Sequence, residues 1–171
     1  MTYCLDCVKI VAYAIVAFAT IIKERRFSVR QTNIISRCEG IYRQDKLKDS
    51  GLSSCHHSYI LAICHHPGMT QDQLAKHICI DKSGVTRHLS YLEKKGYVER
   101  RADQHDKRAI CVFPTQKMLD ILPEVKKIVK DWNDYLTKDI DREELECFNR
   151  VLEKIAERAQ KYIYEKEVSE K

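Results

Sequence analysis

The sequence predicts a mainly α-helical protein that carries one small β-hairpin. Apolar residues recur at the three- and four-residue spacing of an α-helix through most of the 171 residues, and the pattern changes to a strand-like one at 97–113. The chain has five glycines and three prolines, which are few for the tight turns of an all-β protein. Its length allows one ordinary domain with a sizeable core and is cramped for two full ones.

The first two helices are predicted from apolar spacing and from the breaks that follow them. A helix over 32–48 ends at the Asp-Ser-Gly sequence at 49–51. Ser53 or Ser54 can then cap a second helix, which ends at the Pro-Gly pair at 67–68.

Two shorter helices are predicted from their capping residues. Thr70 and Gln73 have the spacing of a capping box, which starts a helix that runs through Ile78. Asp81 is the expected N-cap of the next helix, and Gly96 is its stop signal. The buried face of these two helices is expected to consist of Leu74, Ala75, Ile78, Val85, Leu89 and Leu92.

The remainder of the chain predicts a hairpin and two long helices. Residues 97–101 and 109–113 are strand-like and enclose a charged tip at 102–108. Helical spacing then runs over 115–136 and again over 141–162.

A short helix, a turn, a second helix and a hairpin follow one another in the order of a winged helix-turn-helix, which we place at 53–115. The formal charge of +5 suits a polyanionic partner. Arg, Lys, Ser, Thr and Gln side chains at helix starts and at a wing tip can reach DNA bases and phosphates. The residues expected to contact double-stranded DNA are Thr70, Gln71, Lys76, Lys82, Ser83, Thr86, Arg87, Ser90, Lys107 and Arg108.

Four segments together resemble the multiple-antibiotic-resistance regulator (MarR) family. They are PGMTQDQLA at 67–75, IDKSGVTR at 80–87, LEKKGYV at 92–98 and DKRA at 106–109. The resemblance covers about 32–163 of a domain that we place at 29–171. Gly84 departs from the family pattern, which usually has Thr or a similar residue there, so we expect a slightly looser helix start.

The resemblance implies the protein's assembly and regulation. It implies a homodimer whose dimerisation helices come from 29–50 and 116–164, with two winged lobes on a pseudo-palindromic operator. It also implies a cytoplasmic repressor that is released by a small-molecule effector, such as an aromatic acid or a phenolic compound. The candidates for the effector pocket are Cys38, Tyr42, His57 and Tyr59.

Cysteine and histidine clusters suggest alternatives. The sequences Cys-His-His at 55–57 and 64–66 lie nine residues apart, so on one helix they point about 180° from each other and cannot share a metal ion. A metal-responsive regulator, or one that senses thiol oxidation at Cys38, remains an alternative within the same fold. A Cys/His enzyme is a poor alternative because no oxyanion-hole loop or convergent acid accompanies the pair. We therefore expect no enzyme activity, assign no metal ligands and predict no cofactor.

The segment 1–28 lies outside the family pattern. Its apolar run at 10–22 is shorter than the roughly 20 residues that span a bilayer. It can be an extra helix at a dimer interface, a weak membrane anchor, or translated sequence upstream of the true start; a membrane partner is not expected. The eight cysteines show no disulfide framework and are expected to be free thiols.

Overall fold

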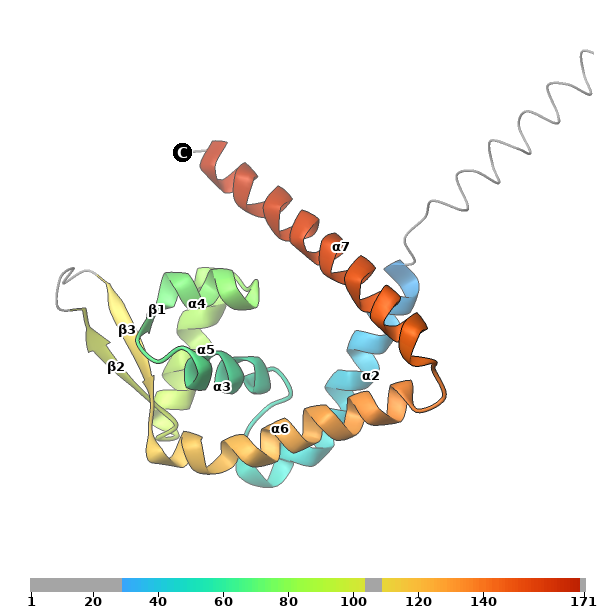
Figure 1. Ribbon diagram of the computed structural model, residues 1–171. Helices are drawn as coiled ribbons and strands as arrows, with labels where there is room; N and C mark the ends of the chain where they lie inside the picture. The colour runs from blue at the N-terminus through green and yellow to red at the C-terminus, as the bar shows by residue number, and fades with distance from the viewer. Residues whose placement is uncertain (1–28, 104–108, 170–171) are drawn as a thin grey trace, which may run out of the picture. The chain divides into compact units, whose positions relative to one another are not determined.

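The computed structural model describes residues 29–103 and 109–169. The chain divides into two units, 1–39 and 40–171. The first core helix extends across this division, and everything after it belongs to the second unit. The elements are, in order, α2 (Val29–Leu47), the 3₁₀ helix η1 (Lys48–Ser50), α3 (His56–His65), β1 (Met69–Thr70), α4 (Gln71–Ile78), α5 (Lys82–Lys94), β2 (Val98–Ala102), β3 (Ile110–Pro114), α6 (Gln116–Thr137) and α7 (Arg142–Ser169) (Figure 1). The predicted fold class, mainly α with a small β-hairpin, is confirmed.

Capping residues define the starts of α4 and α5, as the sequence predicts. The Thr70 hydroxyl accepts a hydrogen bond from the Gln73 backbone N–H at 3.2 Å, and the Gln73 side chain accepts one from the Thr70 N–H at 2.8 Å. At α5, the Asp81 carboxylate accepts from the Gly84 N–H at 2.8 Å. These bonds satisfy N–H groups that have no partner inside the helix, so both helix starts are locally fixed.

The start of α3 differs from the prediction. The residue that precedes the helix is Cys55, and it makes no side-chain capping bond, so the expected serine cap is wrong. The Ser53 hydroxyl instead lies 3.1 Å from Cys55 Sγ and 3.1 Å from His56 Nδ1. The hydroxyl is therefore engaged by side chains rather than by the backbone of the helix.

The wing belongs to a three-stranded antiparallel sheet in the order β1-β3-β2. The predicted hairpin is the pair β2–β3, with Arg100 opposite Val112. Strand β1 was not expected, because two residues are too few to show alternation; it pairs Met69 with Val112. Gly68 has φ +87°, which glycine adopts without strain, and its N–H donates to Val112 O at 2.8 Å.

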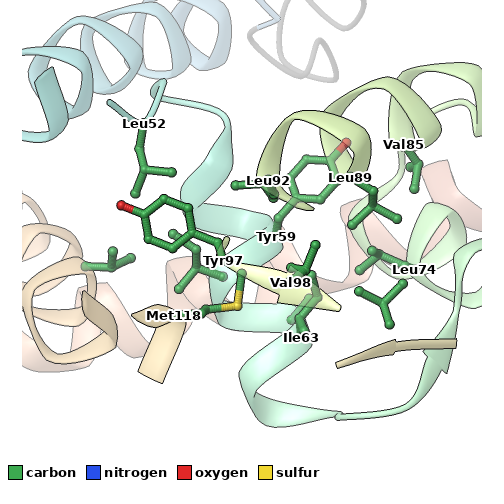
Figure 2. Close-up of a cluster of buried hydrophobic side chains, with 14 of the residues drawn as sticks. Leu52, Tyr59, Ile63, Leu74, Val85, Leu89, Leu92, Tyr97, Val98 and Met118 are labelled. Carbon is green, nitrogen blue, oxygen red and sulfur yellow. The ribbon is translucent and has the colours of Figure 1, made fainter. Parts of the chain in front are cut away.

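The core of the second unit lies between α3, α4, α5, the sheet and the start of α6 (Figure 2). Leu74, Val85, Leu89 and Leu92 are fully buried, as predicted, and Ile78 is half-buried. Tyr59 and Tyr97 are also buried there, and their hydroxyls point away from each other in Figure 2. This packing holds α4, α5 and the wing on one scaffold.

None of the helices in the described part of the chain is long and apolar enough to cross a membrane. The segment 1–28, for which three interpretations were open, lies outside the described residues.

Candidate nucleic-acid interface

Helix α5 presents one polar face to solvent and buries the other. Val85, Leu89 and Leu92 point into the core, which leaves the intervening positions outside. The exposed residues of this face include Lys82, Ser83, Thr86, Arg87 and Ser90. All five are candidates from the sequence, and the structure places them on one side of a single helix of 13 residues.

Helix α4 packs against α5 and, together with its N-cap residue, adds three further candidates. Gln71 is half-buried, and its side-chain Oε1 lies 3.5 Å from the Thr86 hydroxyl, so it connects the start of α4 to the second turn of α5. Lys76 is exposed at the other end of α4. Thr70 holds the capping box, so its hydroxyl is engaged by the α4 backbone.

Several polar groups on this surface already have partners. Lys82 Nζ donates to Asp72 Oδ2 at 2.7 Å, and both side chains are largely exposed. The hydroxyls of Thr86 and Ser90 each donate at 2.9 Å to the backbone carbonyl four residues earlier. An exposed ion pair of this kind contributes less than about 1 kcal/mol, so Lys82 can exchange its partner at little cost.

Gly84 has a structural role that its departure from the family pattern did not suggest. A Cβ atom at this position would lie 2.9 Å from Asp81 Oδ2 and 3.0 Å from Ile80 Cγ2. Those separations are shorter than van der Waals contact. The absence of a side chain therefore lets the Asp81 carboxylate close over the helix start, which fixes that start rather than loosening it.

The wing is attached to α5 by an ion pair. Arg100 on β2 donates to Glu93 on α5 through Nε at 2.9 Å and through Nη2. The hydrogen bonds from Arg100 hold the pKa of Glu93 below its usual range. The wing-tip candidates Lys107 and Arg108 lie outside the described residues.

The four effector-pocket candidates lie in different environments. Cys38 is exposed on the part of α2 that belongs to the first unit. In the second unit, Tyr42 stacks on Trp132 with ring centroids 4.9 Å apart, and Tyr59 is fully buried in the core. His57 lines a cavity of about 350 Å³ on α3 and α4. The structure does not place Tyr42 or Tyr59 in the lining of that cavity.

His57 is oriented by two groups. Its Nδ1 donates to Ser54 O at 2.9 Å, and its Nε2 accepts from the Arg43 guanidinium. Burial, with a smaller contribution from Arg43, lowers the pKa of His57. The ring is therefore neutral at pH 7.

A second cluster joins α3 to the buried side of α5. His88 Nδ1 lies 3.3 Å from His56 Nε2 and 3.8 Å from Cys55 Sγ. Burial, with a smaller contribution from His88, lowers the pKa of His56 to about 4. Sequence reasoning missed His88 because it is 33 residues from Cys55, and helical spacing carries no information about such a contact.

Comparison with known proteins identifies the same fold. A family model described as MarR family matches residues 50–109. The HTH-type transcriptional regulator YybA of Bacillus subtilis is 24% identical over 127 residues, which are 74% of this chain and 85% of YybA.

Two solved structures extend the likeness beyond the matched segment. A MarR transcriptional regulator from Methanosarcina mazei Go1 is 27% identical, with a TM-score of 0.72 over 77% of this chain and 95% of that one. A MarR family transcriptional regulator from Listeria monocytogenes, complexed with 26mer DNA, is 22% identical, with a TM-score of 0.76 over 80% of this chain and 91% of that one. The winged helix-turn-helix of this chain, residues 50–109, therefore matches the MarR family, and the fold is that of the MarR transcriptional regulators.

Proposed function

We propose that this protein binds double-stranded DNA in a sequence-specific manner and represses transcription as a homodimer. The observation that carries the proposal is the exposed polar face of α5, beside the capped start of α4. A helix with this polarity fits the major groove, where Arg pairs with guanine and Ser or Thr reaches bases or phosphates. The Listeria relative, which was solved in complex with 26mer DNA, supports DNA as the partner.

Within this face we assign two kinds of contact. Arg87 is exposed in the N-terminal half of α5 and has no ion-pair partner within the described parts of the chain, so it is our candidate for base contact. Lys76, exposed on α4, is our candidate for phosphate contact. Base contacts determine sequence preference, whereas phosphate contacts strengthen binding to every sequence.

The experiment selects bound fragments from a genomic library and then measures affinity for a selected and an unrelated fragment across a salt series. We expect Arg87→Ala to reduce the ratio of the two affinities, and Lys76→Ala to weaken both affinities alike with a salt slope lower by about one. Arg142→Ala and Lys130→Ala are matched controls, because both side chains are exposed and pair within their own helices. Equal behaviour of Arg87→Ala and Lys76→Ala would reject the assignment of contacts.

The homodimer is supported by apolar side chains that the single chain leaves exposed. On α6 and α7 these include Leu119, Leu136, Phe148, Val151 and Ile163. Soluble proteins rarely expose so many large apolar groups along helices unless a partner covers them. Sedimentation at micromolar concentration tests this proposal; a monomer would contradict it.

Release by a small-molecule effector completes the proposal. An effector shifts the equilibrium only if it binds the DNA-free arrangement more tightly than the DNA-bound one. The family resemblance suggests an aromatic acid or a phenolic compound, and we expect the protein to work in the cytoplasm. The test measures operator affinity with and without each compound of a panel of this kind. If no compound changes the affinity, the proposed release by an effector is rejected.

A further inference from the structure

Three metal-binding side chains converge where the start of α3 meets α5. The ligand atoms of Cys55, His56 and His88 lie within 4.8 Å of one another. Within the described residues, 29–103 and 109–169, these three form the one cluster of side chains placed to hold a metal ion. His56 is buried, whereas Cys55 and His88 are half-buried. We propose that Cys55, His56 and His88 bind one zinc ion per chain, with the fourth coordination position open to water.

The distances approach those of a tetrahedral zinc site. Zinc bonds of about 2.3 Å to sulfur and about 2.05 Å to nitrogen place ligand atoms about 3.6 Å (sulfur to nitrogen) and about 3.3 Å (nitrogen to nitrogen) apart. The separation of His56 Nε2 from His88 Nδ1 is 3.3 Å, and that of Cys55 Sγ from His88 Nδ1 is 3.8 Å. Cys55 Sγ also lies 4.0 Å from His88 Nε2, so a rotation of the imidazole can direct either nitrogen at the ion.

Ser53 supplies the outer partner that such a site needs. Without metal, the Ser53 N–H donates to His56 Nδ1 at 3.0 Å, and His56 Nε2–H is left to donate to His88 Nδ1. Zinc binding at Nε2 moves the His56 proton to Nδ1, so the Ser53 N–H gives up its hydrogen bond to Nδ1 and the Ser53 hydroxyl, 3.1 Å away, accepts the proton instead. Metal-bound histidines commonly donate their second ring N–H in this way. The Cys55 thiol releases its proton to solvent and binds as thiolate.

The cluster also has a route to solvent. A hollow of about 530 Å³ is lined by His56 and His88 together with Ser53, Arg87 and Tyr91. An ion and its fourth ligand, water, can enter there. One thiolate neutralises only one of the two charges of zinc, and Arg87 adds a further positive charge nearby, so the site is expected to be weaker than a structural zinc site with several thiolates.

Zinc would connect two parts of the fold that are distant in sequence. His88 follows Arg87 directly on α5, whereas Cys55 precedes α3 and His56 is its first residue. A bound ion fixes His88 against α3 and restricts the turn of α5 that carries Arg87. If the protein binds DNA as proposed above, zinc alters its operator affinity; this one expectation rests on the proposed function, whereas zinc binding does not.

The test uses the full chain, reduced and freed of metal with a chelator. Zinc affinity is measured by competition with a coloured chelator, and Co²⁺ serves as a spectroscopic probe whose thiolate absorption band reports a Cys ligand. We expect one ion per chain, with affinity reduced more than about 10-fold in Cys55→Ser and in His88→Gln. The Co²⁺–thiolate band should disappear in Cys55→Ser.

The matched controls are Cys64→Ser, a half-buried thiol near the other end of α3, and His77→Gln, an exposed histidine outside the cluster. Both should bind zinc like the wild type, and circular dichroism verifies the fold of all four variants. The proposed site would be overturned if the wild type binds less than one zinc ion per chain, or if Cys55→Ser keeps the wild-type zinc affinity. It would also be overturned if the control variants lose as much zinc affinity as Cys55→Ser. Zinc binding in a protein that binds no DNA would reject the proposed function and leave the site intact.

Discussion

Two buried tyrosines in the same core provide a test of how hydrogen bonds stabilise this fold. Tyr59 is 0% exposed, and its hydroxyl has no hydrogen-bond partner among the described residues. Burial is the main reason that the pKa of Tyr59 is raised to about 12. Tyr97 is 3% exposed, but its hydroxyl donates to Ser50 O at 3.1 Å. The same substitution, Tyr to Phe, therefore removes an unpaired group at one position and a paired one at the other.

The expected free energies have opposite signs. Tyr97→Phe removes a hydrogen bond worth about 1 kcal/mol and should lower the free energy of unfolding by that amount. Tyr59→Phe removes a hydroxyl whose burial without a partner costs about 1–3 kcal/mol, partly offset by the small void left behind, so it should raise the free energy of unfolding by about 1 kcal/mol. The two variants should then differ by about 2 kcal/mol, or by roughly 4–8 °C in Tm.

The assay is urea unfolding followed by circular dichroism, with chelator present and the protein concentration held constant. The Tyr59 ring lies 5.4 Å from the His88 ring, so metal must be excluded. A loss of stability in Tyr59→Phe equal to that in Tyr97→Phe would refute the reasoning. It would show that the Tyr59 hydroxyl makes a stabilising bond.

Three further predictions concern α5 and its neighbours. Leu89→Ala should lower the free energy of unfolding by about 2–5 kcal/mol, because Leu89 is fully buried; a loss under 1 kcal/mol in urea unfolding would contradict the assigned core. Glu93→Gln should lower stability at pH 7 by less than about 1 kcal/mol. Because Arg100 lowers the folded-state pKa of Glu93, this stabilisation exists above the normal pKa of Glu and disappears as pH falls through the folded value, so unfolding curves of variant and wild type should converge in acid. Thr115→Ala should cost about 1 kcal/mol in thermal unfolding, since the hydroxyl caps α6 and donates to Gly96 O at 2.7 Å, whereas Thr115→Ser should cost less.

The sequence was informative where structure depends on neighbouring residues. The exposed face of α5 followed from the spacing of Val85, Leu89 and Leu92, because the period of a helix determines which side chains share a side. The capping box at Thr70 followed for the same reason, since both of its bonds join residues three apart. Local patterns thus predicted the helices and most of the candidate surface.

The features that were missed depend on partners distant in the chain. Strand β1 exists because β3 pairs with it, more than 40 residues later. His88 meets Cys55 only once α3 and α5 pack together, and the Ser53 hydroxyl turns to His56 instead of capping α3. The role of Gly84 depends on the position of the Asp81 carboxylate. Spacing along the sequence cannot reveal contacts of these kinds.

The attachment of α5 at several points limits how regulation can act. The Tyr91 hydroxyl donates to Gly51 O at 2.5 Å, and the Glu93–Arg100 pair joins α5 to β2. Leu92 on α5 and Val98 on β2 are also buried in the same core, so the helix and the wing strand are held together by packing as well as by these bonds. If the protein is the effector-responsive dimer proposed above, an effector that leaves these contacts intact changes the separation of the two lobes more readily than the angle between helix and wing within one lobe. Affinity for an operator can then vary while the bases that each lobe prefers stay the same.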